Sequence, residues 1–490
     1  MTLREIFDGL PIQDSAYDGG LAVTGITYDS RKVRKGSLFV CIEGFITDGH
    51  RFAGQAASQG AVALLVQKPV DSVGCAWACV PDTRAALALV SKRFFQDPCS
   101  RMSVAGVTGT SGKTSVSFLL RSILEASGHR TGLIGPVANI FDGEESFAVR
   151  STPESSDLLA LLDEMAAADI KDCVMEVSSQ GIQLGRIDGC SFSAGVFSNL
   201  YSDYVGMTDP SAFTQALDSK IRFARRCREI IVNRDAEYAE AFLSLLGAPA
   251  LQPALTYGLT ASADVRAENI RPEKREGRLG SVFSLASPWF SGEVFLGLPC
   301  RYQVSNALAA IACAALKGAK LEDIRCALSA AVIPGCAEPI GGRTDFGVFI
   351  DSAHTPQTMS RLLCAMREYT AGRLLCVFGC NGNTMAATRS AMGREVSLRA
   401  DLAFVAPDNP YLEDPARIAA DIVSGFGGSR IRPIVYDDRS RAISDAVSEA
   451  REGDIVIIAG KGHHNYQMFG SRTEWFSDAE HAGRALDNLE

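Results

Sequence analysis

The residues with the clearest chemical meaning lie in the run Ser103-Val-Ala-Gly-Val-Thr-Gly-Thr-Ser-Gly-Lys-Thr-Ser115. It breaks into a loop with glycines at 106, 109 and 112, and a loop of this kind lets backbone N–H groups face an anion. Lys113 can reach outer phosphates, and the Thr114 hydroxyl is placed to hold a magnesium ion. Val107 stands where the strict Walker spacing has its first glycine. The run still predicts a nucleoside triphosphate site at Gly109, Thr110, Ser111, Gly112, Lys113 and Thr114.

Two regular elements must position this loop. The apolar run Met102 to Val107 predicts a buried strand before it. A helix is expected from about Lys113, because Val116, Leu119, Leu120 and Ile123 follow the i, i+3, i+4, i+7 spacing of one apolar face. The positive end of that helix would face the bound phosphates.

Composition limits the class of protein. A chain of 490 residues suggests about three domains, and 47% hydrophobic with 21% charged residues is ordinary for a soluble protein. The net charge of -9 argues against nucleic-acid or membrane-surface partners. No apolar run approaches 18 residues, the N-terminus lacks a signal-peptide core, and no cysteines form a CxxC pair. We therefore expect a cytoplasmic protein without membrane insertion, zinc or disulfides.

The alternation of apolar strands and helical stretches predicts an α/β protein of three domains, 1–98, 99–337 and 338–490. The first is a small α/β domain. The second is a parallel-sheet domain around the phosphate loop, with a small accessory sheet between about 264 and 299. The third is a second doubly wound, Rossmann-like sheet.

Polar residues follow several of the expected strands, where ligands bind in parallel sheets. Glu176 and Asn199 end two strands of the middle domain, and a carboxylate at 176, opposite Thr114, is a plausible magnesium ligand. In the third domain four strand ends are polar, which predicts a binding face at 351–355, 379–382, 408–411 and 460–464.

In these motifs the chain resembles the Mur ligase family, and most closely its members that add a third amino acid to UDP-N-acetylmuramoyl-L-alanyl-D-glutamate. The loop Gly109-Thr-Ser-Gly-Lys-Thr114 is similar to the family's GTNGKT, and Asp29-Ser-Arg31 and Asp48-Gly-His50 are similar to its uridine-nucleotide domain. The resemblance runs through all three domains. It implies an ATP- and Mg²⁺-dependent amide ligase of peptidoglycan synthesis, monomeric, with a UDP-muramoyl-dipeptide and an amino acid as substrates.

The resemblance also implies roles for individual residues. The catalytic set would be Lys113, Glu176 and Lys220, with magnesium held at Thr114, Glu176 and a carbamylated Lys220 (N6-carboxylysine). The muramoyl-dipeptide would be held by Ser30, Ser151, Thr152, Ser178 and Arg186. Asn306 and His354 would lie on the adenine side, and Asp351 at the ribose or a phosphate. The incoming amino acid would meet Arg389, Asp408, Asn409, Tyr411, Gly460 and His464.

The sequence departs from the family pattern at several of these positions. Tyr204 replaces a histidine near the second metal, and Cys336 replaces an arginine for which Arg343 is the nearest substitute in sequence. Tyr411 and His464 stand where family members that use meso-diaminopimelate pair an arginine and a glutamate with its far end. We therefore expect an amino-acid pocket that diverges from those members and a third amino acid other than meso-diaminopimelate.

Two other classes stay open at this point. One is an amide ligase of the same fold that serves a specialised peptide pathway, and the other is a binding homologue with impaired catalysis. The N-terminal domain favours a UDP-linked acceptor, and the presence of Lys113, Thr114, Glu176 and Lys220 argues against a dead enzyme. A GTPase is less favoured, because the sequence has no NKxD motif.

Overall fold

The computed structural model describes residues 1–70, 74–199, 210–246, 254–341 and 344–489. Two compact units, Met1–Tyr257 and Gly258–Glu490, are described separately below. Tyr204 and Arg343 lie outside the described residues. None of the helices in the described ranges is long and apolar enough to cross a membrane.

The first unit begins with a five-stranded sheet in the order β1-β5-β4-β3-β2, parallel except for the edge strand β1. Its strands are β1 (Asp14–Ala16), β2 (Gly25–Thr27), β3 (Ser37–Val40), β4 (Ala63–Val66) and β5 (Ala76–Cys79). Its helices are α1 (Leu3–Phe7), α2 (Ala53–Ser58) and α3 (Thr83–Phe94). Strands β3 and β4 are buried on both faces, as expected of central parallel strands.

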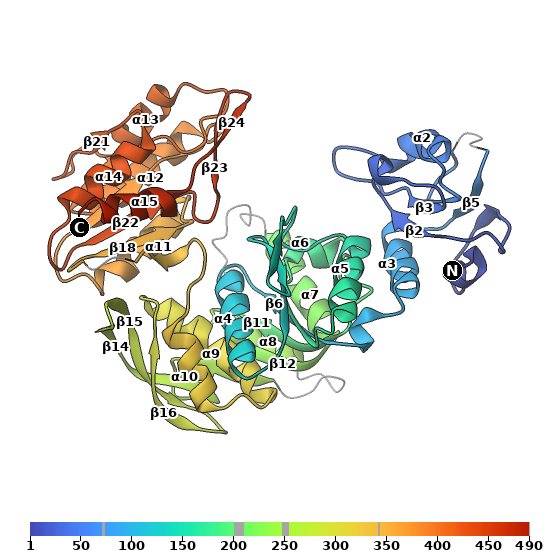
Figure 1. Ribbon diagram of the computed structural model, residues 1–490, viewed down its shortest axis with the longest axis horizontal. Coiled ribbons are helices and arrows are strands. Elements are labelled where there is room, and N and C mark those ends of the chain that lie inside the picture. The colour runs from blue at the N-terminus through green and yellow to red at the C-terminus, as the bar shows by residue number, and fades with distance from the viewer. Residues whose placement is uncertain (71–73, 200–209, 247–253, 342–343, 490) are drawn as a thin grey trace. The chain divides into compact units, whose positions relative to one another are not determined.

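The phosphate-loop strand β6 lies inside a second sheet, next to β11 (Figure 1). The strands of the first unit follow one another in this sheet in the order β13-β12-β11-β6-β10-β7-β8-β9. The predicted parallel arrangement is confirmed from β13 to β7, and β8 and β9 extend it as antiparallel strands. The strands are β6 (Ser103–Thr108), β7 (Thr131–Ile134), β8 (Asn139–Phe141), β9 (Glu144–Ser146), β10 (Asp172–Glu176), β11 (Phe192–Phe197), β12 (Cys227–Asn233) and β13 (Leu255–Gly258). The helices are α4 (Lys113–Ala126), α5 (Ser155–Ala167), α6 (Ser179–Gln183), α7 (Pro210–Ala224) and α8 (Ala239–Leu246).

The prediction that Gly106 opens the phosphate loop is wrong. Gly106 lies inside β6 and pairs with Met175 of β10 and Gly195 of β11. A Cβ there would lie 2.6 Å from Cζ of Phe223, so this glycine lets α7 pack closely on the sheet. The loop itself begins after Thr108.

The second unit opens with three antiparallel strands in the region where a small accessory sheet was predicted: β14 (Val265–Arg275), β15 (Arg278–Ala286) and β16 (Ser291–Leu296). They do not form a sheet of their own. Helices α9 (Arg301–Leu316) and α10 (Leu321–Ser329) follow. α9 is buried around most of its circumference, which fits its alanine-rich sequence.

The rest of this unit is the predicted second doubly wound sheet, in the order β17-β18-β22-β19-β20-β21 with only β17 antiparallel. The strands are β17 (Cys336–Pro339), β18 (Gly347–Asp351), β19 (Leu374–Phe378), β20 (Leu402–Val405), β21 (Ile434–Val435) and β22 (Ile455–Ala459), followed by the hairpin β23 (Tyr466–Phe469) and β24 (Arg472–Trp475). The helices are α11 (Pro356–Arg367), α12 (Ala386–Arg399), α13 (Pro415–Ser424), α14 (Arg439–Glu449) and α15 (Asp478–Asp487). Separate apolar clusters cover its two faces.

Candidate active site

The loop between β6 and α4 has the backbone of a phosphate cradle. Gly112 caps α4 in the left-handed region with φ +82°, and Gly109 has φ +154°. A Cβ on Gly109 would lie 1.9 Å from Oγ of Ser198, so no larger residue fits there. Helix α4 begins directly after this loop, and the first N–H groups of a helix have no partner within the helix, so they can bind an anion.

Asn199 closes this loop through hydrogen bonds from its side chain. Its Oδ1 accepts hydrogen bonds from the N–H groups of Thr110 (3.0 Å) and Ser111 (2.9 Å). Its Nδ2 donates to the Ser111 carbonyl (3.1 Å). The amide oxygen thus occupies two donors that a phosphate oxygen would use. The sequence marked Asn199 only as a strand end, and nothing in it revealed this contact.

The Lys113 side chain is hydrogen-bonded to the same loop. Its Nζ donates to the carbonyls of Gly109 (3.0 Å) and Thr110 (3.3 Å). Both acceptors are neutral, and the charge of Lys113 also opposes the rise that burial causes in the pKa of the Glu176 carboxyl.

Glu176 ends β10 beside the loop, because its register partner on β6 is Val107. It is 2% exposed and hydrogen-bonds to the Thr114 side chain. Burial raises the pKa of this carboxyl, against the opposing effects of Lys113 and Thr114. A hydroxyl and a carboxylate at one phosphate loop are oxygen ligands of the kind that magnesium prefers, so these residues fit the ion.

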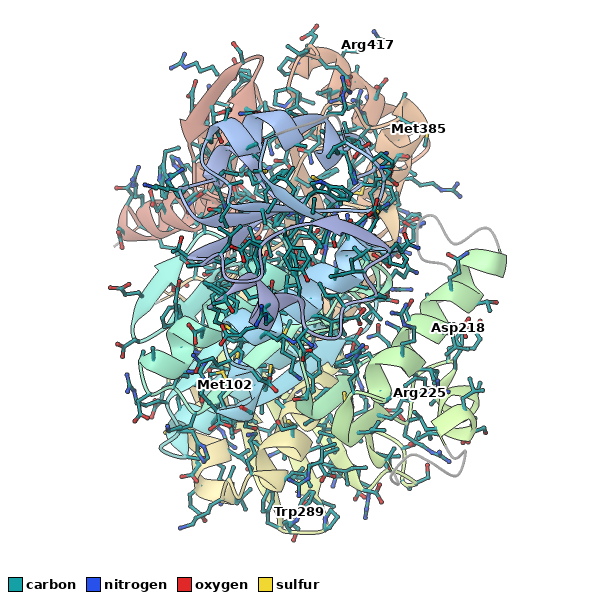
Figure 2. All side chains as sticks on the ribbon, turned by 90° about the vertical axis from the view of Figure 1, so that its right-hand side faces the viewer. Met102, Asp218, Arg225, Trp289, Met385 and Arg417 are labelled. Atoms are coloured by element: carbon teal, nitrogen blue, oxygen red, sulfur yellow. The ribbon has the colours of Figure 1, made fainter. Side chains whose placement is uncertain are left out.

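Lys220 lies on α7, the helix that also carries Asp218 (labelled in Figure 2), and is 4% exposed. Within the described residues its Nζ has one polar neighbour in hydrogen-bond range, Oγ1 of Thr108 at 3.5 Å. Burial lowers the pKa of this amine to about 7, and repulsion from Lys113 lowers it further in the same direction. A substantial share of the amine is therefore uncharged near neutral pH.

The residues expected to hold the dipeptide form a buried polar cluster near Glu176. Thr152 is fully buried; its Oγ1 donates to the Glu176 carbonyl (3.0 Å) and accepts from the Ser178 N–H (2.9 Å). Arg186 donates through Nε to Glu154 (3.0 Å) and through Nη1 to the Thr152 carbonyl (3.2 Å). Their side chains are thus largely engaged within the protein.

Glu154 was missed by sequence reasoning. It precedes α5 at its N-cap position and binds two arginines, Arg186 and, at 3.1 Å, Arg84 of α3. A glutamate before a helix is ordinary in sequence, so no signal could have identified it. Of the other predicted dipeptide residues, Ser30 begins the 3₁₀ helix Ser30–Lys32 after β2 and Ser151 is half-buried.

In the second unit, Asp351 ends β18 and accepts hydrogen bonds from the N–H groups of Ala337 (2.8 Å) and Ala353 (2.9 Å). Desolvation raises the pKa of its carboxyl to about 6 in spite of these bonds. His354 is exposed, and its ring is hydrogen-bonded through Nδ1 to the Ser352 carbonyl (2.7 Å). Asn306 is buried on α9, where its Nδ2 donates to Gln303 (2.9 Å).

Arg389, expected to meet the amino acid, is 3% exposed on α12 and bound by two carboxylates. These are Glu413 (2.7 Å) and Asp421 (3.1 Å). Its Nε is buried without a hydrogen-bond partner in the described part of the chain. An incoming carboxylate would therefore have to share this guanidinium with groups already bound to it.

Asp408 and Asn409 are organised by a buried lysine that the sequence did not single out. Nζ of Lys461 lies 3.2 Å from Oδ1 of Asp408 and 3.5 Å from Oδ1 of Asn409. The Met468 N–H also donates to Oδ1 of Asn409 (3.0 Å), so the amide NH₂ remains as the donor end of that side chain. Gly460 has φ +116°, and a Cβ there would approach Asp408 to 2.9 Å.

Tyr411 and His464 are brought to the same region by the β23–β24 hairpin. Tyr411 has φ +54°, and its N–H donates to the Met468 carbonyl (3.1 Å). The His464 ring lies 4.4 Å from that of His463 and 5.5 Å from that of Tyr466. Partial desolvation, and then repulsion from Lys461, lower the pKa of His464, so the ring is neutral at pH 7.

This fold and this phosphate loop match three models of one family: the Mur ligase family catalytic domain over residues 22–94, the Mur ligase middle domain over 107–314, and the Mur ligase glutamate ligase domain over 337–462. The chain belongs to the Mur ligase family and has its three-domain α/β architecture. It is an ATP-dependent ligase that forms an amide bond.

Relatives and solved structures agree with this assignment. UDP-N-acetylmuramoyl-L-alanyl-D-glutamate–2,6-diaminopimelate ligase 1 of Clostridium acetobutylicum is 35% identical over 493 residues, covering all of both chains. The ligase named for the same reaction in Bacillus cereus is 35% identical over 95% of this chain and 94% of its own. A solved ligase of that name has a TM-score of 0.74 at 27% identity, covering 100% and 99% of the two chains. A MurF ligase of Thermotoga maritima in complex with ADP shares the fold, with a TM-score of 0.60 at 18% identity over 96% and 99% of the chains.

Proposed function

We propose that this ligase adds the third amino acid to UDP-N-acetylmuramoyl-L-alanyl-D-glutamate during peptidoglycan precursor synthesis. The observation that carries the proposal is the phosphate loop that holds Lys113, together with Glu176 at the adjacent strand end, which hydrogen-bonds to Thr114 and whose pKa burial raises against the opposing charge of Lys113. The relatives at 35% identity are named for this acceptor, which supports the same acceptor here.

The reaction we propose runs through an acyl phosphate. The dipeptide carboxylate attacks the γ-phosphorus of ATP, the bond to ADP breaks, and the amino acid's nitrogen then displaces phosphate from the acyl carbon. Lys113 and the N–H groups at the start of α4 stabilise the charge that builds on the transferred phosphoryl group. Magnesium, when bound by Thr114 and Glu176, supplies further positive charge there. For these donors to act, the Asn199 oxygen must leave the N–H groups of Thr110 and Ser111.

We also propose that Lys220 acts as a carbamate. A buried lysine amine is a poor magnesium ligand while it is a cation, whereas a carbamate offers two oxygens and a negative charge. The lowered pKa of the amine supports the modification, because only the uncharged form reacts with CO₂. The positive charge of Lys113, which opposes the ammonium, would stabilise the carbamate.

The remaining contacts belong to the same proposal. Ser30, Ser151 and Arg186 would meet the UDP-muramoyl-dipeptide, with Thr152 and Ser178 holding the polar cluster beneath it. Asn306, Asp351 and His354 would serve the adenosine part of ATP.

The third amino acid, we propose, is not meso-diaminopimelate. The far end of that molecule carries an ammonium and a carboxylate. The ammonium is best bound by an anionic side chain and the carboxylate by a cationic one. Tyr411 and His464, at the two positions concerned, are a phenol and a neutral imidazole. Losing a charge-assisted pair costs about 2–5 kcal/mol where the pair is buried, roughly 30-fold or more in selectivity. Tyr411 is half-buried and His464 is exposed, so this magnitude holds if the bound substrate covers them. A smaller or uncharged side chain fits these two residues better, with the Asn409 NH₂ left to hold a carboxylate.

A competition assay tests the choice of amino acid. Diaminopimelate, lysine, ornithine and neutral amino acids are supplied at equal concentration with ATP and the dipeptide, and products are separated by mass. We expect a neutral or shorter amino acid to dominate. A dominant diaminopimelate product would show that this chain shares the specificity for which its relatives are named, and would overturn the proposal.

A further inference from the structure

A small apolar pocket lies directly beside Lys220 in the first unit. It is lined by Phe197, Leu217, Val232 and Phe242 together with alanines at 236 and 239 and the Lys220 side chain. The strands β11 and β12 supply one wall, and helices α7 and α8 supply the other. The pocket therefore sits between the sheet and two helices, next to the phosphate loop rather than in it.

Its size restricts what it can hold. The cavity volume is about 30 Å³. About 10–15 Å³ measured in this way holds one water, so the pocket admits a molecule of two or three heavy atoms. An amino acid, a nucleobase or a phosphate is too large.

Its polarity restricts the occupant further. Two asparagines and Tyr238 also line the pocket, and the asparagine amides are engaged by the chain. Asn233 donates to the Ser198 carbonyl (2.8 Å) and accepts from the Asp235 N–H (3.0 Å), and Asn199 is bound to the phosphate loop. The wall is otherwise mostly hydrocarbon, which is unfavourable for bicarbonate or another ion. Lys220 is the reactive group at its edge.

From this geometry we infer that the pocket is a holding site for molecular CO₂, which delivers it to the Lys220 amine. The inference rests on the carbamylation proposed above and adds the route by which it occurs. In the step, the amine nitrogen forms a bond to the carbon of CO₂ and one C=O electron pair moves onto oxygen. A proton then leaves the nitrogen for solvent, so an amine and CO₂ give a carbamate and H⁺. Bicarbonate, the commoner species in water, cannot undergo this addition, and an apolar pocket excludes it.

A matched pair of variants on α8 tests the route. Ala239 lines the pocket and is buried, whereas Ala241 lies on the same helix and is exposed. Leucine at 239 fills the pocket, and leucine at 241 adds the same volume outside it. Full-length wild type, Ala239→Leu and Ala241→Leu are mixed with ¹³CO₂-equilibrated buffer, and the lysine carbamate signal is followed by ¹³C NMR.

We expect Ala241→Leu to match the wild type and Ala239→Leu to form carbamate at least about tenfold more slowly, because little room remains in a close-packed interior. Equal rates in all three, with carbamate formed, would overturn the pocket's role and leave the carbamylation proposal intact. A wild type that forms no carbamate would overturn both.

A second measurement does not depend on the variants' folding. Xenon binds dry apolar cavities, so crystals of the wild type under xenon pressure should show an atom between Phe242 and Lys220. A pocket that stays empty under xenon, or that holds ordered water, would contradict the inference.

Discussion

Two lysines and one buried carboxylate set the electrostatics of the phosphate site. Burial shifts Glu176 toward its protonated form, and burial and Lys113 together shift Lys220 toward its neutral form. Both groups therefore carry less charge at their buried positions than they would in water. A bound triphosphate with magnesium would supply the opposite charges that these groups lack.

Lys113→Ala should abolish phosphate release. The ammonium is the loop's only side-chain cation, and loss of one preorganised charge partner of a transition state costs about 10²–10³ in rate. Circular dichroism should be unchanged, because Nζ contacts only two loop carbonyls in the described structure. Undiminished turnover in this variant would contradict the role given to Lys113.

Glu176→Gln should keep the stability of the protein and lose its magnesium-dependent activity. The neutral amide removes the cost of burying a carboxylate and can still hydrogen-bond to Thr114, so the melting temperature should hold or rise. Magnesium-dependent turnover should be lost. The check is a thermal melt beside an activity titration with magnesium; full activity at ordinary magnesium would exclude Glu176 as a ligand.

His463 should make the second unit less stable in mild acid. Burial, and then His464, lower its pKa to about 4, so the folded ring stays neutral where the unfolded ring, with a pKa near 6.5, takes a proton. Stability from this group is present above pH 6.5 and is lost as the pH falls toward 4. After discounting for its partial exposure, the loss from pH 7.5 to 5 is about 1 kcal/mol.

Hydrogen exchange of the β22 amides, Ile455–Ala459, measures this effect. The wild type should lose about 1 kcal/mol more protection than His463→Gln between the two pH values. An equal loss in both would show that His463 does not titrate as described.

The sequence predicted one part of the fold best: β6, the phosphate loop and α4. An apolar run, glycines and an amphipathic helix are local signals, and the expected helix start at Lys113 is confirmed. Gly106 was misassigned because its reason is tertiary: the ring of Phe223 packs where a side chain would be. The hydrogen bonds of Asn199, Glu154 and Lys461 could not be predicted either. Each joins residues that lie at least 32 positions apart in the chain, so no local pattern reveals it.

Gly106→Ala should disturb α7. The added methyl would lie 2.6 Å from Phe223, one helical turn from Lys220, and overpacking of this kind costs about 1–3 kcal/mol. Gly54→Ala is the matched control, because a Cβ on Gly54 of α2 meets nothing within 4 Å and alanine favours helix.

A thermal melt and the phosphate-release rate should both fall for Gly106→Ala and not for Gly54→Ala. A melting temperature that falls equally in both variants, or in neither, would rule out close packing as the reason for this glycine.

For the whole molecule, the fold class and the three-domain family architecture were predictable from sequence, because they follow from strand and helix alternation and from motifs in order along the chain. The specificity of the amino-acid site was not, since Arg389 proves to be bound by Glu413 and Asp421. The relatives are named for diaminopimelate, and the proposal of another amino acid for this chain rests on Tyr411 and His464.

The proposed function couples ATP cleavage by this chain to amide formation on the UDP-muramoyl-dipeptide. It is tested most directly by measuring phosphate, ADP and amide product in one reaction, with each substrate omitted in turn. The predicted result is equal amounts of all three products, formed only when ATP, magnesium, the dipeptide and an amino acid are present together. Phosphate release without amide, or amide formed on another acceptor but not on this dipeptide, would contradict it.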